Sequence, residues 1–221
     1  MTPIEFETSP SPQHSVIWLH GLGADGNDFV PVAEALSLPD MRFIFPHAPM
    51  RPVTLNGGYV MRAWYDIYAL DLSSGEDREG IMASSDRIAK LIAREGERGI
   101  PAHHVFLAGF SQGGAVALFS GLSHAERLAG IIALSTYLPL AETIKAHPAN
   151  SNTPIFMAHG RDDEIIPFPA GIASKERLLN LGHELAWHDY EMGHSVCQQE
   201  IADISAWISG AISKIRETAA P

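Results

Sequence analysis

Short runs of apolar and β-branched residues recur along the chain, and longer stretches between them repeat apolar residues at every third or fourth position. The first pattern is typical of strands buried on both faces of a sheet, and the second of amphipathic helices. The strands predicted in this way are residues 15–19, 42–45, 105–108, 130–134, 155–158 and 184–190, and the helices are residues 28–36, 85–98, 112–120, 170–181 and 197–214. Because strands and helices alternate, we predict a mostly parallel central sheet with helices on both faces.

One connection is much longer than the others. Residues 46–80 contain prolines, glycines and several aromatic side chains, and no strong strand or helix pattern. Long connections in compact domains are usually functional. We therefore predict that residues 46–80 form a binding pocket, with Trp64 as an apolar wall that contacts substrate. A core position for Trp64 is the alternative.

Composition and charge narrow the classes of partner. The 221 residues, 46% of them hydrophobic, predict one domain over residues 1–221. A net charge of -11 repels phosphate backbones, which argues against a nucleic-acid partner. Because no apolar run is long enough for a transmembrane helix and no signal-peptide pattern opens the chain, we expect a cytoplasmic protein. The single cysteine, Cys197, lies in no metal-ligand pattern and no HExxH motif occurs, so no metal site is expected.

The segment Gly109-Phe110-Ser111-Gln112-Gly113 lies where a predicted strand ends and a predicted helix begins. This is the context of the G-x-S-x-G nucleophile elbow, in which a serine is exposed on a tight turn. The glycines serve a steric purpose, because strand and helix approach each other closely around the serine. A glycine-rich turn that only tightens packing would look the same, so the other motifs decide between the two interpretations.

A serine hydroxyl needs a base to take its proton and a carboxylate to orient that base. In this type of fold the chain order is serine, acid, histidine. The loop after strand 155–158 carries Asp162 and Asp163, and the loop after strand 184–190 carries His194. Both loops follow parallel strands, at the edge of the sheet where ligands bind. His194 is therefore the predicted base, and either aspartate is a candidate acid.

The tetrahedral intermediate needs backbone N–H groups to stabilise its negative oxygen. One is expected from Gln112, which follows the nucleophile, and one from an early loop. The glycine-rich turn at residues 20–26 follows the first predicted strand, and we expect the N–H of Leu22 to be the second donor. This turn lacks the glycine spacing and the lysine of nucleotide-binding loops, which argues against a phosphate site.

Five segments of the chain resemble the phospholipase/carboxylesterase family, which includes bacterial carboxylesterases and acyl-protein thioesterases: LHGLGADGNDF, MRAWYDI, GFSQGG, HGRDDEIIP and GHSV. The resemblance spans nearly the whole chain and implies an α/β-hydrolase fold that needs no cofactor. It also implies Ser111 as nucleophile, His194 as base and, counted from the HG pair, Asp163 as acid. The oxyanion donors implied are again Leu22 and Gln112.

The sequence thus predicts a serine hydrolase that cleaves small-molecule carboxylic esters or thioesters through an acyl-enzyme. Carboxylesterase is the leading interpretation. A minor departure from the family is the MGHSV segment, which looks closer to the bacterial esterases than to the eukaryotic thioesterases. Acyl-protein thioesterase and lysophospholipase are alternatives with the same chemistry. A binding module that kept the fold and lost the chemistry is an alternative of a different class. The sequence leaves a homodimer open.

Overall fold

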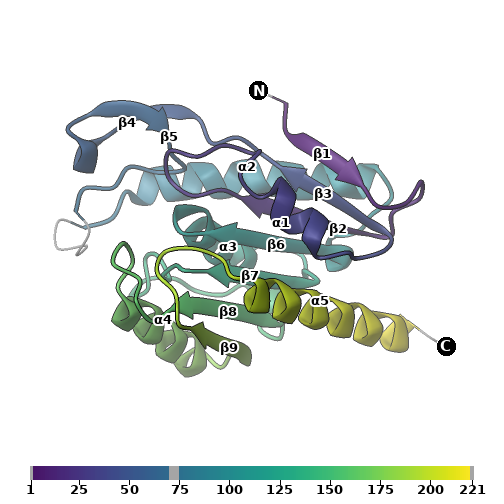
Figure 1. The fold of residues 1–221 in the computed structure, drawn as a ribbon. Coiled ribbons are helices and arrows are strands. Elements are labelled where there is room, and N and C mark those ends of the chain that lie inside the picture. Colours follow the sequence, from purple (N-terminus) through teal and green to yellow (C-terminus); the bar gives the residue numbers. More distant parts are fainter. Residues whose placement is uncertain (1, 70–74, 220–221) are drawn as a thin grey trace.

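A twisted sheet forms the centre of the molecule in the computed structural model, which describes residues 2–69 and 75–219 (Figure 1). Seven strands follow the order β1-β3-β2-β6-β7-β8-β9. All neighbours are parallel except β1, which runs antiparallel to β3 at one edge. The strands are β1 (Ile4–Glu7), β2 (His14–Leu19), β3 (Met41–Phe45), β6 (Val105–Phe110), β7 (Gly130–Leu134), β8 (Ile155–Gly160) and β9 (Leu185–Tyr190).

Helices pack on both faces of this sheet, as the alternating pattern predicts. Their bounds are α1 (Val30–Ala35), α2 (Arg78–Glu97), α3 (Gln112–Ser123), α4 (Phe168–Asn180) and α5 (Gln198–Ala219). Successive residues of a strand point to opposite faces. Phe106 of β6 accordingly belongs to the core under α1 and α5, whereas Leu107 belongs to the core under α2 and α3. Helix α4 packs on the same face as α3, where Leu178 lies in a cluster with Ile131.

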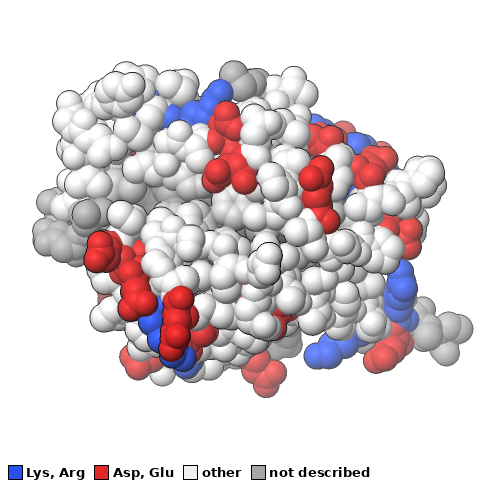
Figure 2. Space-filling model, in the orientation of Figure 1, with Lys and Arg blue, Asp and Glu red and all other residues white. Residues whose placement is uncertain are grey.

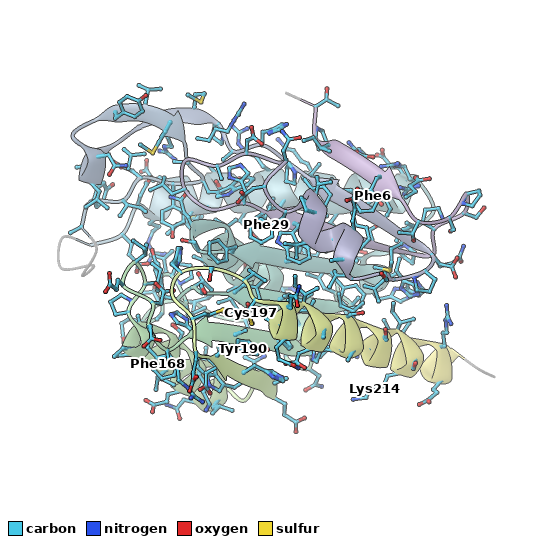
Figure 3. The ribbon with its side chains drawn as sticks, in the orientation of Figure 1. Phe6, Phe29, Phe168, Tyr190, Cys197 and Lys214 are labelled. Carbon is cyan, nitrogen blue, oxygen red and sulfur yellow. The ribbon has the colours of Figure 1, made fainter. Side chains whose placement is uncertain are left out.

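Three strands were not predicted from the sequence. The edge strand β1 carries Phe6 (Figure 3). The Phe6 ring stacks on that of Phe43 at a centroid distance of 4.9 Å. Strands β4 (Met50–Val53) and β5 (Tyr59–Arg62) pair as a separate antiparallel hairpin. These strands are short and partly exposed, so they lack the continuous apolar run that marks a buried strand.

The predicted excursion over residues 46–80 is too long at its C-terminal end. Helix α2 begins at Arg78 and not at residue 85, because the Asp77 carboxylate caps it by accepting the N–H of Gly80 at 2.9 Å. A glycine in the first turn weakens the helical signal in the sequence. The excursion therefore ends at Asp77, and its residues 70–74 lie outside the described residues.

The hairpin β4–β5 lies at the end of the sheet toward which the parallel strands point (Figure 1). Met50, Tyr59 and Val60 are exposed on it. The hairpin also carries Arg51 and Arg62, and Figure 2 shows no acidic patch over this part of the surface. No helix in the described part of the chain is long and apolar enough to cross a bilayer. The hairpin thus borders the carboxyl edge of the sheet with apolar side chains.

Glu200, in the first turn of α5, is fully buried, and neither of its carboxylate oxygens accepts a hydrogen bond. Burial raises its pKa from 4.5 to about 8; the negative charge of Asp203 adds to the rise, and the nearby Cys197 amide offsets part of it. The native state therefore keeps this proton at neutral pH, whereas the unfolded chain releases it above about pH 4.3. Native stability consequently falls as the pH rises between these two values.

We expect Glu200→Gln to raise the melting temperature by several degrees at pH 8 and to change it little at pH 4.5. Each pKa unit corresponds to about 1.4 kcal/mol, and each kcal/mol shifts Tm by about 2–4 °C in a domain of this size. Thermal unfolding at the two pH values measures the effect. Glu176→Gln, at an exposed position of α4, is the matched control. An equal shift at both pH values would show that burial of the carboxyl is not the cause.

Candidate active site

Ser111 occupies the sharp turn between β6 and α3. Its backbone angles are φ 54° and ψ -123°, in a region that residues other than glycine rarely adopt. Such a conformation costs about 1–3 kcal/mol and persists where the surroundings enforce it. Here the Ser111 N–H donates to the carbonyl of Leu134 at 2.9 Å, and the Thr136 hydroxyl donates to the carbonyl of Ser111 at 2.6 Å. The turn is therefore fixed by the residues at the end of β7.

The glycines beside Ser111 allow a close approach of backbones. A Cβ on Gly113 would lie 2.3 Å from the carbonyl oxygen of Leu19, and one on Gly109 would lie 2.2 Å from that of Gly113. No side chain fits either space. The start of α3 therefore packs directly on the end of β2, as the steric argument from the sequence predicts.

Asp163 and His194 are brought together by the loops after β8 and β9. His194 Nδ1 lies 2.7 Å from Asp163 Oδ2 and donates to it. Asp163 Oδ1 accepts the N–H groups of Ile165 and Ile166, each at 2.9 Å. The neighbouring Asp162 is exposed, whereas Asp163 is buried. Of the two candidate acids, only Asp163 is thus hydrogen-bonded to the imidazole.

A close contact between the two loops holds this pair in place. A Cβ on Gly160 at the end of β8 would lie 2.3 Å from the carbonyl oxygen of Met192 and 2.5 Å from that of Gly193. The loop that carries His194 therefore lies directly on the strand that leads to Asp163.

His194 also packs beside the elbow. Its ring centroid lies 4.6 Å from that of Phe110, the residue before Ser111. Because Nδ1 donates to Asp163, Nε2 is left as the nitrogen that can accept a proton. The Ser111 hydroxyl makes no hydrogen bond to His194 in this structure. Such bonds are often long without substrate and tighten when it binds.

The two predicted oxyanion donors border Ser111. Neither Leu22 nor Gln112 uses its backbone N–H in a hydrogen bond to another described residue. A Cβ on Gly21 would lie 3.5 Å from Ser111 Cβ, so the loop that carries Leu22 adjoins the serine. Gln112 follows Ser111 at the first position of α3, where a helix leaves its N–H groups unpaired. Both N–H groups are thus available near the elbow.

Known proteins match this chain over nearly its whole length. The family described as Phospholipase/Carboxylesterase matches residues 4–212. The chain belongs to the phospholipase/carboxylesterase family. Acyl-protein thioesterase 1 of Neurospora crassa is 40% identical over 217 residues, which cover 92% of this chain and 89% of the relative.

Solved structures of similar proteins agree. Arabidopsis thaliana SOBER1 has a TM-score of 0.85 at 32% identity, covering 90% of this chain and 99% of its own. Zea mays acyl-protein thioesterase 2 has a TM-score of 0.84 at 29% identity, covering 95% and 98%. These neighbours confirm the α/β-hydrolase fold. As a member of this family the protein is an ester or thioester hydrolase, and its relatives favour the thioesterase alternative over the carboxylesterase interpretation.

Trp64, in the MRAWYDI segment that the resemblance to the family includes, is only 2% exposed and lies in the core cluster with Leu19 and Ile88. Its indole N–H donates to the carbonyl of His20 at 2.8 Å, and its backbone N–H donates to Gln112 Oε1 at 2.9 Å. Contact with substrate stays a prediction for this residue. The contacts that the structure shows are with the two segments that carry the oxyanion donors.

Two buried histidines support the site and were not singled out from the sequence. His20 donates from Nδ1 to the carbonyl of Gly21 at 2.7 Å and accepts the Ala48 N–H on Nε2 at 3.0 Å. His159 donates from Nε2 to the carbonyl of Ile166 at 2.8 Å, behind Asp163. Burial lowers the pKa of both rings, so both are neutral. The only sequence signal for them is their position directly before a glycine at the end of a strand.

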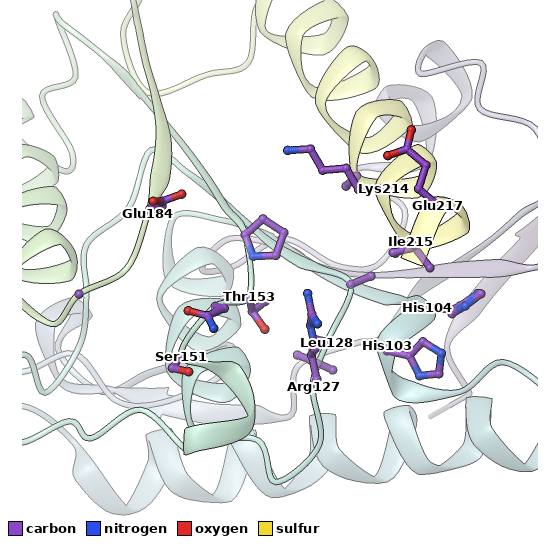
Figure 4. Close-up of a pocket in the computed structure, with 15 residues that line it drawn as sticks. His103, His104, Arg127, Leu128, Ser151, Thr153, Glu184, Lys214, Ile215 and Glu217 are labelled. Atoms are coloured by element: carbon purple, nitrogen blue, oxygen red, sulfur yellow. The ribbon is translucent and has the colours of Figure 1, made fainter. Parts of the chain in front are cut away.

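A separate cavity of about 980 Å³ lies at the other end of the strands (Figure 4). Its lining comes from residues just before β6, β7, β8 and β9 and from the last turns of α5, among them His103, Arg127, Thr153, Glu184 and Lys214. No group of three or more His, Cys, Asp and Glu side chains within residues 2–69 and 75–219 is arranged to hold a metal ion. The cavity lies at the amino ends of the parallel strands, whereas Ser111 follows the carboxyl end of β6, so the two sites are at opposite ends of the strands.

Proposed function

We propose that this protein is a serine thioesterase of the acyl-protein thioesterase type, with Ser111 as nucleophile, His194 as base and Asp163 as acid. The observation that carries the proposal is the 2.7 Å hydrogen bond between His194 Nδ1 and Asp163 Oδ2, formed beside a strained serine turn. Nucleophile, base and orienting acid are the three roles that acyl transfer through serine requires.

Acylation begins when Ser111 Oγ attacks the carbonyl carbon of the acyl group and passes its proton to His194 Nε2. The carbonyl oxygen becomes an oxyanion, which the N–H groups of Leu22 and Gln112 stabilise. Asp163 stabilises the imidazolium that forms. The C–S bond then breaks, and the leaving thiolate takes the proton from Nε2. The product is an acyl ester of Ser111.

Deacylation repeats these steps with water. Water gives a proton to His194 Nε2 as its oxygen attacks the acyl carbon, and the same two N–H groups stabilise the second oxyanion. The bond to Ser111 Oγ breaks, and Oγ regains the proton from Nε2. One thioester and one water thus give a carboxylic acid and a thiol, and the enzyme returns to its starting state.

The acylated-protein substrate class rests on the relatives. The proteins at 36–40% identity are named acyl-protein thioesterase 1. A site bordered by the exposed apolar hairpin β4–β5 suits a substrate with an acyl chain, because Met50, Tyr59 and Val60 offer apolar surface. Carboxylic esters and lysophospholipids remain substrates with the same chemistry.

Two peptides that differ in one atom test the proposal. One carries an acyl group on cysteine, and the other carries the same acyl group on serine in the same sequence. Because a thiol ionises near pH 8.5 and leaves far more readily than an alcohol, we expect a kcat/KM about tenfold or more higher for the thioester. A lysophospholipid of equal chain length is the third substrate, and Ser111→Ala is the control for each.

The other outcomes separate the alternatives. Preference for the serine ester would favour a carboxylesterase, and preference for the lysophospholipid would favour a lysophospholipase. A protein that hydrolyses none of the three and does not react with a fluorophosphonate probe would be a binding module.

A further inference from the structure

We propose that Trp64 is a positioning residue that holds both oxyanion donors in place, an inference that rests on the proposed function. Through its indole and its backbone, Trp64 is hydrogen-bonded to the loop of Leu22 and to the side chain of Gln112. We call the set of Trp64, Tyr65 and the Gln112 side chain the oxyanion brace. On this proposal Trp64 affects kcat and does not select substrates by the length of their acyl chain.

The first half of the brace acts on the loop of Leu22. The Trp64 indole N–H donates to the carbonyl of His20 at 2.8 Å, and both residues are buried. The His20 ring lies 5.3 Å from that of Trp64 between centroids. His20 in turn donates from Nδ1 to the carbonyl of Gly21 at 2.7 Å. That carbonyl shares its planar peptide with the Leu22 N–H, so the hydrogen bond limits the direction in which the N–H points.

The second half acts on Gln112. Its side-chain Oε1 accepts the Trp64 N–H at 2.9 Å, and its Nε2 donates to the carbonyl of Tyr65 at 2.7 Å. Both ends of the amide are thus paired with neighbouring residues, and Gln112 as a whole is 2% exposed. The chemistry proposed for Gln112 uses only its backbone N–H, which any residue except proline supplies. The side chain therefore has a purpose of its own, which is to tie the start of α3 to Trp64.

Trp64 is itself firmly held. Its carbonyl accepts hydrogen bonds from the Ser84 hydroxyl of α2 and from Arg51 Nη1 of the hairpin, the latter at 3.3 Å. The segment around it makes two further contacts with the Leu22 loop: Ala48 donates its N–H to His20 Nε2, and Gly23 donates its N–H to the carbonyl of Arg62 at 2.9 Å. The excursion between β3 and α2 thus positions a loop far away in the sequence.

The expected effect follows from the short range of oxyanion stabilisation. Donors must lie about 2.7–3.1 Å from the oxyanion, and the loss of one donor costs about 10²–10³ in kcat. The Trp64→Phe substitution keeps an aromatic ring in the core and removes the N–H that His20 accepts. We expect kcat to fall about 10- to 100-fold, because a displacement of about 1 Å has an effect of this size. KM and the ratio of long-chain to short-chain turnover should stay within about twofold.

Trp18→Phe is the matched control. Trp18 is a buried tryptophan on β2 whose indole N–H has no hydrogen-bond partner, and its ring stacks on Phe29. The two substitutions remove the same atoms from the core, and only Trp64→Phe removes a hydrogen bond. We expect Trp18→Phe to lower the melting temperature and to leave kcat close to that of the wild type.

The test combines steady-state kinetics with binding of a trifluoromethyl ketone that mimics the tetrahedral intermediate. Its affinity should fall in Trp64→Phe by the same factor as kcat/KM, while the affinity for a non-hydrolysable thioether analogue should stay unchanged. Gln112→Met, which keeps the side-chain length and removes both of its hydrogen bonds, should give the same pattern, and it decides the question if Trp64→Phe does not fold.

Three results would overturn the inference. A changed acyl-length ratio would make Trp64 a pocket wall, and equal loss of affinity for both inhibitors would make it a residue of the core alone. A wild-type kcat in both Trp64→Phe and Gln112→Met would show that the brace is not needed. The wild-type enzyme tests the proposed function separately: if it neither turns over substrate nor reacts with a fluorophosphonate, both proposals fail.

Discussion

Replacing Ser111 with alanine is expected to lower kcat by about six orders of magnitude, the loss found when an activated serine is removed from a serine protease. The fold should survive, because the turn is held by the backbone of Ser111 and not by its hydroxyl. Alanine also pays no more than serine for the positive φ at this position. Hydrolysis of a p-nitrophenyl ester and circular dichroism measure the two effects.

His194→Ala should cause a similar loss, and the double mutant should be no worse than either single mutant. Nucleophile and base act as one unit, so once one of them is lost, removing the other lowers kcat no further. Losses that multiply in the double mutant would count against a shared catalytic unit. Labelling by a fluorophosphonate probe should disappear in Ser111→Ala.

The second large effect is expected at the acid. Asp163→Asn should lower kcat by about 10⁴-fold, because the histidine is then held in the wrong tautomer. The surroundings of Asp163 explain why. An asparagine there would keep its oxygen on the N–H groups of Ile165 and Ile166 and would turn its NH₂ group toward His194. Nδ1 would then have to accept, and the proton would move to Nε2, where the serine proton has to go.

Asp162→Asn is the matched control for this substitution, on the adjacent residue of the same loop. Asp162 is exposed and its carboxylate makes no hydrogen bond to a described residue, so we expect less than about a threefold change in kcat, as for most exposed positions. Both variants should be measured with the same ester under the same conditions. The reverse ranking would mean that the acid is Asp162.

The inner strands of the central sheet could be predicted from the sequence because they are buried on both faces, whereas the edge strand β1, which is partly exposed, could not. Each of the strands β2, β3, β6, β7 and β8 shows an apolar run that predicts it within a few residues, and the half-buried edge strand β9 was predicted as residues 184–190. The hairpin β4–β5 shows no such run, since its side chains face solvent on at least one side. Helix α2 starts where Asp77 caps it, and Gly80 in the first turn weakens the helical pattern that would predict this start from the sequence.

The sequence predicted that the candidate site residues lie at the carboxyl ends of the strands, because parallel strands end together, and in the structure Ser111, Asp163 and His194 follow β6, β8 and β9. It did not decide between Asp162 and Asp163 by residue type, and only the resemblance to a family favoured the second. The hydrogen bonds of Trp64 lie beyond any local pattern. They join it to His20 and Gln112, residues 44 and 48 positions away along the chain.

The serine site and the cavity lie at opposite ends of the strands, and this has a practical consequence for handling the enzyme. The serine site lies at the carboxyl ends of the parallel strands, and the last turns of α5 lie beside the cavity at their amino ends. A tether, a fusion partner or a solid support attached through the end of α5 would leave the serine site and the exposed hairpin β4–β5 facing outward. An enzyme immobilised in that orientation would still meet a substrate as large as an acylated protein or a vesicle.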